Sequence, residues 1–122
     1  MVYAKKRKTN PRNKEKNEVE MPILDYLTQV KSVFAFKMPD KAAFVKGRGF
    51  ITSKHPHSIK GLPDIVAMFP SGRIVFIEAK SQTGKQSEHQ HYFQKQCERL
   101  GFEYYLMNRF DPLLLDSICR DK

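Results

Sequence analysis

Several features are scarce or missing in this sequence of 122 residues. There is no Trp, and no apolar run approaches the roughly 20 residues that a membrane-spanning helix needs. The basic N-terminus is not followed by a hydrophobic stretch, so we expect no secretory signal. These absences exclude a membrane protein and predict an intracellular location.

Cysteine is also scarce, because Cys97 and Cys119 are the only two. They could approach each other in space, but thiols stay reduced inside a cell, so we expect no structural disulfide. A zinc site needs more clustered ligands than two cysteines provide. Both residues therefore read as small side chains that face the core.

The composition fits one globular domain. Apolar residues make up 40% of the chain, with nine Phe and five Tyr, which is enough for one modest core. Residues 1–17 carry almost no apolar side chains and are expected to form a basic, disordered tail. Residues 18–122 then form a single domain.

The net charge of +9 is unevenly distributed. Seven basic residues and one acid within residues 1–16 give +6 of this charge. A second basic stretch has Asp40 as its only acid and comprises Lys37, Lys41, Lys46, Arg48, Lys54 and Lys60. Such stretches suit phosphate contact. Charge runs are more often plain solvated surface, so charge permits nucleic acid without establishing it.

Hydrophobic periodicity and turn residues predict the secondary structure. A basic loop over 38–60, which short strand pieces such as Gly49–Thr52 could interrupt, separates the first strand from a hairpin. The first elements are a helix over 18–32, a strand over 33–37, and strands over 65–69 and 74–77 joined by Pro70-Ser71-Gly72. A helix from Ser87 to Gly101, a strand over 102–107 and a helix from Pro112 to Cys119 follow. The order α-β-β-β-α-β-α predicts an α/β domain with a mixed central sheet flanked by helices.

The register of the hairpin places charged residues together. A three-residue loop pairs Phe69 with Arg73, and the same register carried to the open end sets Asp64 opposite Glu78. Lys80 is two residues further along and shares that face. A two-residue Ser71-Gly72 turn would shift the pairing by one and move Asp64 to the other face.

Two opposed carboxylates repel each other unless a cation lies between them. Mg²⁺ prefers oxygen ligands and is usually held by one or two carboxylates together with phosphate and water, and Mn²⁺ should substitute for it. The other interpretation makes Asp64, Glu78 and Lys80 solvated charges at strand ends. Against it, Glu and Lys are poor strand formers directly after an apolar run.

A known family shares this pattern. Gly61-Leu62-Pro63-Asp64, thirteen intervening residues, Glu78-Ala79-Lys80 and then Ser87-Glu88-His89-Gln90 at a helix start resemble the VRR-NUC family, a branch of the PD-(D/E)XK nuclease superfamily. The resemblance covers about residues 18–110. It implies a restriction-endonuclease-like core and a metal-dependent DNA endonuclease.

The resemblance also implies roles for individual residues. Asp64, Glu78 and the backbone carbonyl of Ala79 would bind the metal, and Lys80 would be the catalytic lysine. Gln90 would orient water or Lys80, unless it is an exposed first-turn residue. Either Glu18 or Glu20 would lie near the metal, and the sequence leaves that choice open, since a first-turn acid is also favoured by the helix dipole.

The expected partner is DNA. Its backbone would be contacted by Lys46, Arg48, Lys54 and Lys60, whereas the neighbouring His55 and His57 stay outside the candidate set. Small members of the family resemble phage-encoded enzymes that act on branched DNA, such as Holliday junctions, as homodimers. We therefore expect a homodimer, in a phage-infected bacterial host, with no small-molecule cofactor.

Two other functions remain open. A non-catalytic DNA-binding module would use only the basic tail and loop, and it gains nothing from paired acids that face phosphate. An RNA-associated or ribosome-associated protein is suggested by the tail alone and leaves the hairpin residues unexplained.

Overall fold

The computed structural model describes residues 15–39, 42–45, 49–52, 56–57 and 59–120, so most of the predicted tail lies outside it. The chain enters through a π-helical segment, η1 (Lys16–Glu20), which continues into α2 (Met21–Thr28) with Pro22 in its first turn. This helical unit begins two residues before the expected Glu18.

The first helix is shorter at its C-terminal end than predicted. It ends at Thr28 rather than at residue 32. Val30 and Val33 then donate backbone hydrogen bonds to carbonyls three residues earlier, at Leu27 and Val30. These tighter turns reverse the chain so that the next strand packs back against α2.

Four strands form the central sheet. They are β1 (Phe34–Lys37), β4 (Ile65–Met68), β5 (Ile74–Ala79) and β6 (Glu103–Met107), and they lie in the order β1-β4-β5-β6. β1 and β5 are each antiparallel to β4, whereas β6 runs parallel to β5. The predicted mixed sheet is confirmed.

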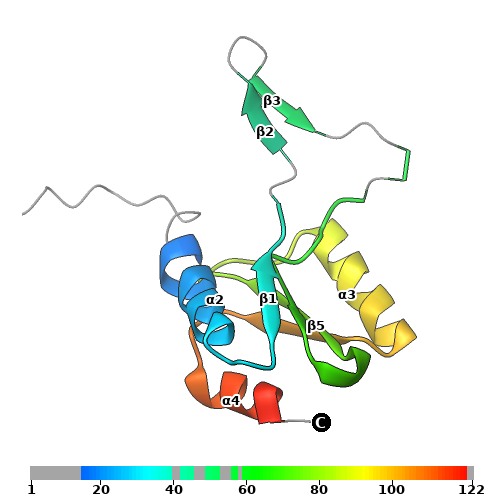
Figure 1. The fold of residues 1–122 in the computed structure, drawn as a ribbon. Helices are drawn as coiled ribbons and strands as arrows, with labels where there is room; N and C mark the ends of the chain where they lie inside the picture. The colour runs from blue at the N-terminus through cyan, green and yellow to red at the C-terminus, as the bar shows by residue number, and fades with distance from the viewer. Residues whose placement is uncertain (1–14, 40–41, 46–48, 53–55, 58, 121–122) are drawn as a thin grey trace, which may run out of the picture.

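A second, two-stranded sheet interrupts the basic loop. It pairs β2 (Ala42–Val45) with β3 (Gly49–Thr52) and stands away from the central sheet (Figure 1). The predicted element order named only the second of these strands as an option and omitted the first. Ala42 and Ala43 are weak strand formers, and Phe44 and Val45 alone are too short a run to predict β2.

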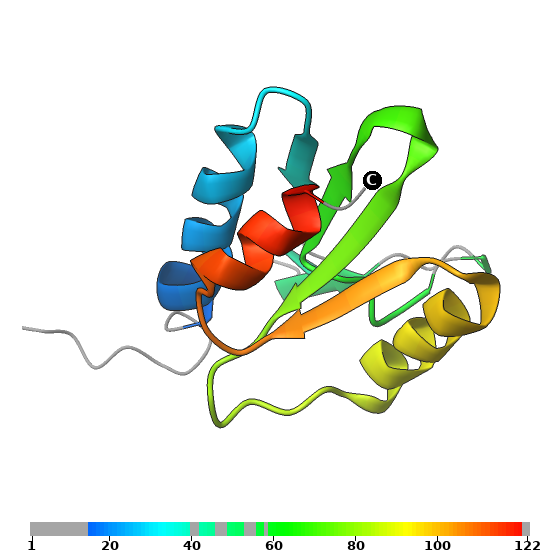
Figure 2. The same ribbon diagram turned by 90° about the horizontal axis from the view of Figure 1, so that it is seen from below.

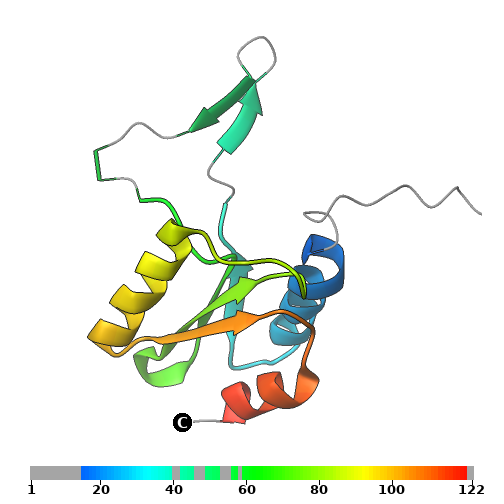
Figure 3. The ribbon, with the colours of Figure 1, turned by 180° about the vertical axis from the view of Figure 1, so that it is seen from behind.

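Helices cover the central sheet on both sides. α3 (Glu88–Leu100) lies on one face, while α2 and α4 (Pro112–Arg120) lie on the other (Figures 2 and 3). The ends of α3 follow the prediction, because Ser87 and Gln90 form a reciprocal capping box and Gly101 adopts the left-handed conformation at φ 83°. None of the described helices is long and apolar enough to cross a membrane.

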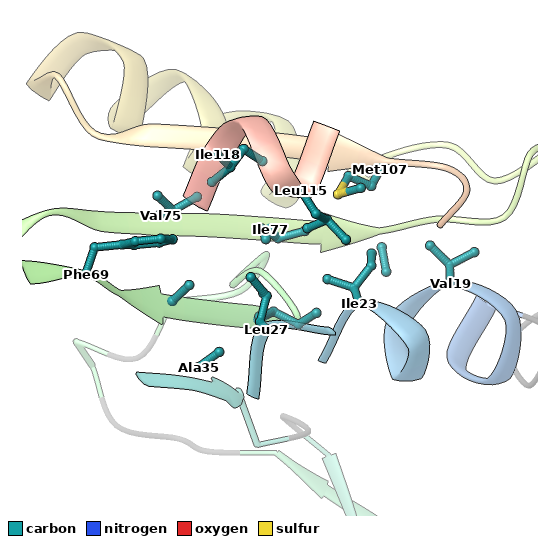
Figure 4. Packing of buried hydrophobic residues seen from close by; sticks show 13 residues of the cluster. Val19, Ile23, Leu27, Ala35, Phe69, Val75, Ile77, Met107, Leu115 and Ile118 are labelled. Atoms are coloured by element: carbon teal, nitrogen blue, oxygen red, sulfur yellow. The ribbon is translucent and has the colours of Figure 1, made fainter. Parts of the chain in front are cut away.

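The core lies between the sheet and the pair α2 and α4 (Figure 4). Alternate residues of the hairpin point into it, and Ile65, Ala67, Val75 and Ile77 are fully buried there. The helices supply their own buried side chains, namely Ile23, Leu27, Leu115 and Ile118. Cys97 is buried, Cys119 is half-buried, and both are free thiols.

Arg73 ties the turn end of the sheet together. Its guanidinium donates two hydrogen bonds to the Glu103 carboxylate, at 2.5 and 2.7 Å, and one of 2.6 Å to the carbonyl of Ile118. The Arg73 hydrogen bonds lower the pKa of Glu103 below its usual range. One side chain therefore links β5, β6 and α4.

Candidate active site

The β4–β5 hairpin has the register that the three-residue loop predicts. Ile65 pairs with Ile77 and Met68 with Ile74, while the Phe69 N–H donates to the Arg73 carbonyl at 2.8 Å. The loop is closed by positive φ angles at Ser71 (64°) and Gly72 (77°). The alternative two-residue turn is wrong, and Asp64 stays on the face of Glu78.

Asp64 sits directly before β4 and is fixed by the backbone around it. The Ala79 N–H donates to Asp64 Oδ2 at 2.9 Å, and the Met38 N–H donates to the Asp64 carbonyl at 2.7 Å. The bond from Ala79 to Asp64 extends the hydrogen-bonding pattern of the hairpin by one step, with a side-chain oxygen accepting in place of a backbone carbonyl. The carboxylate is thereby held against the end of β5.

Glu78 is the most enclosed charged residue of this end of the sheet, with 1% of its surface exposed. Gln90 Nε2 donates to Glu78 Oε1 at 2.9 Å, and the Lys80 Nζ lies 3.7 Å from the same oxygen. The other oxygen, Oε2, is buried and has no hydrogen-bond partner in the described part of the chain. A buried acceptor of this kind is costly unless it gains a ligand.

The protonation of Glu78 reflects this environment. Burial contributes most, the neighbouring Asp64 carboxylate adds to it, and together they raise the pKa of Glu78 from an ordinary 4.5 to about 9. The Lys80 ammonium offsets only part of this rise. Without a cation, the protonated form of Glu78 is therefore favoured near neutral pH.

Gln90 is half-buried and has two structural roles, so it is not merely an exposed first-turn residue. Its side-chain oxygen accepts from the Ser87 N–H at 2.9 Å, which caps α3, and its amide nitrogen binds Glu78. The amide thereby orients the Glu78 carboxylate, and the predicted role toward water or Lys80 stays a prediction.

The two acids of the first helix differ in burial. Glu18 is exposed, whereas Glu20 is 4% exposed, and its Oε2 lies 3.5 Å from the Lys37 ammonium. Burial, followed by the Asp64 charge, raises the pKa of Glu20, and Lys37 opposes that rise. Of Glu18 and Glu20, it is therefore Glu20 that lies on the Asp64 side of the site.

These oxygens suit a hard divalent cation. Glu78 and Glu20 each present a buried oxygen without a hydrogen bond, and Asp64 and Glu78 repel each other. Within the described ranges, no three His, Cys, Asp or Glu side chains are grouped closely enough to hold a metal by themselves. Asp64 and Glu78 are therefore the side chains that could hold such a cation, and the Ala79 carbonyl stays a prediction.

Three further residues border the site and were not predicted. Burial and then the Glu78 charge raise the pKa of Tyr104, and Gln86 Nε2 donates to its hydroxyl at 3.1 Å. The Glu15 charge also contributes to the raised pKa of Glu78, although the sequence placed Glu15 in the tail. The sequence could not place Tyr104 beside the site, because this position depends on the non-local parallel pairing of Phe76 with Tyr104.

The predicted DNA contacts are mostly outside the described residues. Lys46, Arg48, Lys54 and the nearby His55 all fall there. Lys60 is described and exposed, and it lies four residues before Asp64. His57 is also exposed.

A mixed sheet with helices on both faces and acids at the open end of its central hairpin has the restriction-endonuclease-like α/β architecture. More specifically, a solved structure described as "VRR_NUC domain" matches with a TM-score of 0.57 and 20% identity, over 86% of this chain and 92% of that one. The chain has the fold of a VRR-NUC domain, which confirms the predicted fold. No family model and no curated protein matches the sequence.

Proposed function

We propose that this chain is a metal-dependent endonuclease that hydrolyses phosphodiester bonds in DNA. The observation that carries the proposal is the pairing of buried Glu78 with half-buried Asp64, whose mutual repulsion has no structural benefit and favours a bound cation. The lysine two residues after Glu78 supplies a positive charge at the same position. The VRR_NUC name of the protein with the same fold supports the assignment.

Each residue would have a distinct task. Asp64, Glu78 and the Ala79 carbonyl would hold Mg²⁺, or Mn²⁺ in its place, which lowers the pKa of the attacking water and polarises the scissile phosphate. Lys80, half-buried and 3.7 Å from Glu78, would balance the charge that builds on the phosphate or hold the proton of the attacking water. Gln90 would keep the Glu78 carboxylate oriented toward its ligands.

Glu20 and Lys37 form a second pair beside this set. Lys37 Nζ lies 3.5 Å from Glu20 Oε2, so the ammonium holds this carboxylate beside the proposed metal site. Lys37 would limit the acidic charge that accumulates around Asp64. Glu18 is too exposed to serve in this way.

The substrate assignment rests on charge and on resemblance. A net charge of +9, with exposed Lys60 next to the site, favours a polyanion. A domain of this size has little surface to grip a duplex, and symmetric cutting of a junction requires two sites. We therefore propose a homodimer that acts on branched DNA.

A cleavage assay tests the function directly. Linear duplex, flap and four-way-junction DNA are each incubated with the protein in Mg²⁺, in Mn²⁺ and in EDTA. We expect cleavage with either metal and none in EDTA. Lys80→Ala should slow cleavage by about 10²–10⁴-fold. Lys85→Ala, which removes an exposed lysine five residues further along, is the matched control and should leave the rate unchanged.

The outcomes separate the competing functions. Binding of DNA without cleavage of any substrate in either metal would show a non-catalytic DNA-binding module. Equal rates for Lys80→Ala and wild type would remove the role of that lysine. Light scattering should give about twice the 14.3 kDa mass of one chain, and a monomer would refute the dimer.

A further inference from the structure

A groove of about 570 Å³ lies beside the proposed catalytic centre, between α3 and the segment that leads into β4. It is lined by Ile59, Lys60, His89, Tyr92, Phe93 and Gln96. We propose that this groove binds one unpaired nucleotide of the DNA, so that cleavage occurs next to a single-stranded segment. This inference rests on the proposed nuclease function and names its substrate class.

The groove is held in shape by a close backbone contact. Gly61 has a φ of +85°, and a Cβ atom at this position would lie 2.2 Å from the carbonyl carbon of His89. Only glycine lets the 59–61 segment rest on the first turn of α3. The wall formed by Ile59 and Lys60 is therefore fixed against the wall formed by the helix.

The floor and one wall are aromatic. The Phe93 ring packs edge-on against Phe76 at 5.4 Å and lies 6.2 Å from Tyr104, so it is rigidly supported by the sheet. Tyr92, one residue earlier on α3, is 65% exposed. A supported floor next to an exposed ring is the arrangement that stacks on the face of any base.

The lining is mainly apolar and aromatic, which suits the face of a base, and it includes a few polar groups that a purely apolar partner would leave unused. Lys60 and His89 can donate to a phosphate, and the Gln96 amide can donate to or accept from a base edge. None of the six lining residues is acidic. The volume lies within the roughly 300–1,000 Å³ of ordinary small-ligand sites, which is ample for a single nucleotide.

Two short chain segments connect the walls of the groove to the proposed catalytic centre. Lys60 is four residues before Asp64 along the chain, and His89 directly precedes Gln90, whose amide binds Glu78. A strand that places one base beside Tyr92 therefore leads its backbone toward the two carboxylates. Fully paired DNA has no free base to place there.

Fluorescence of 2-aminopurine tests this inference. The base analogue is placed in the single-stranded part of a flap and, separately, inside a duplex, and the full-length protein is titrated in EDTA so that nothing is cut. We expect stacking to quench the flap probe with wild type and with Tyr92→Phe. Tyr92→Ala should abolish the quenching and weaken flap binding by about 5- to 100-fold. Duplex affinity should change less than about 2-fold in every variant.

Two further variants sharpen the result. Lys60→Gln should reduce the salt dependence of flap binding by about 0.7 in the slope of log K against log salt, because one phosphate contact is lost. Lys95→Ala, an exposed residue of α3 outside the groove, is the matched control and should behave as wild type. Circular dichroism confirms that each variant is folded.

Two results would overturn the inference: no quenching with wild type, or equal flap affinity for Tyr92→Ala and Tyr92→Phe. Either could occur while metal-dependent cleavage persists, in which case the nuclease proposal stands and the groove serves another ligand. Quenching that depends on Tyr92 in a protein that cuts no DNA would keep the nucleotide site and remove the nuclease.

Discussion

The two faces of the β4–β5 hairpin differ sharply, although they alternate residue by residue. On the α2 and α4 side, Ile65, Val75, Ile77 and their neighbours are fully buried in the apolar core. On the α3 side, the open end carries Asp64, Glu78 and Lys80. The face toward α2 and α4 stabilises the fold, and the face toward α3 carries the candidate catalytic residues.

The difference shows how strongly register matters in this fold. Because side chains alternate, a slip by one residue would drive both carboxylates into the core and expose the isoleucines. The three-residue loop and the Asp64 bond to Ala79 prevent that slip from opposite ends of the hairpin. Buried acids can then exist without loss of the core.

The α3 face is itself divided. Toward the middle of the sheet, Phe76 packs edge-on against Phe93 and Phe102, so that part is sealed. Toward the open end, α3 contributes only Gln90 to the contact with Glu78. The helix therefore closes this face where it is apolar and, at the open end, orients the enclosed Glu78 carboxylate through Gln90.

The largest expected effect is on cleavage. Asp64→Asn keeps the shape of the side chain and an oxygen for the Ala79 N–H, but it removes one negative charge from the proposed metal site. We expect the rate with Mg²⁺ to fall by at least about 10³-fold. The melting temperature of the metal-free protein should not fall, because repulsion of Glu78 is relieved. Single-turnover kinetics and thermal melts measure both, and a marked loss of stability would break the contrast between the faces.

The opposite face should respond in the opposite way. Ile77→Ala removes a fully buried side chain between α2 and α4 and should cost about 2–5 kcal/mol of folding free energy. At a temperature where the variant is still folded, its cleavage rate per folded molecule should stay within about 3-fold of wild type. Urea denaturation gives the stability. A variant that is as stable as wild type would show that this face is not the main source of stability.

Gln90 should show an intermediate effect because it serves both helix and site. Gln90→Ala removes the hydrogen bond to Glu78 and half of the capping box, so we expect about 10–100-fold weaker Mn²⁺ binding or activity. The loss of stability should be only about 1 kcal/mol. Gln94→Ala, one turn further along α3, is the control, and equal effects of the two substitutions would refute the positioning role.

The smallest effect concerns pH. Because the pKa of Glu78 is raised in the folded protein, a protonated Glu78 favours the folded state. This contribution to the folding stability is complete below the ordinary pKa of 4.5 and is lost as pH rises through about 9. Metal-free Glu78→Gln should therefore melt at least about 3 °C above wild type at pH 9, roughly 1 kcal/mol for a domain of this size. The difference should shrink toward pH 5, and a constant difference would contradict the raised pKa.

The same proton predicts how metal binding depends on pH. A divalent cation at Asp64 and Glu78 must displace it, so Mn²⁺ affinity should increase between pH 6 and pH 8. Calorimetry in buffers of different ionisation enthalpy should detect about one proton released per ion. Affinity that is independent of pH would place the ion away from Glu78.

Local sequence patterns were sufficient for much of the fold and for the hairpin. The loop length fixed the register, and Ser87 with Gly101 fixed the bounds of α3, because each depends on neighbours within a few residues. The end of α2 was misplaced, since the reversal after Thr28 is set by packing against β1. The strand β2 was missed because only two of its four residues, Phe44 and Val45, are good strand formers.

The contacts that sequence alone did not predict are those whose partners are distant in the chain. Tyr104 approaches Glu78 only because β6 joins β5 in parallel, and Gln90 reaches Glu78 only because α3 folds over the sheet. The choice of Glu20 over Glu18 depends on how η1 meets the sheet. None of these arrangements leaves a periodicity in the sequence.

The bond between Asp64 and Ala79 also has a consequence for the order of assembly. It joins residues only 15 apart, across a hairpin whose tight loop carries little closure entropy. Such a unit can form early in folding, before β1 and β6 are recruited from a distance. The two acids would then meet in the unfinished chain, where a cation could bind them and favour the correct pairing from the start.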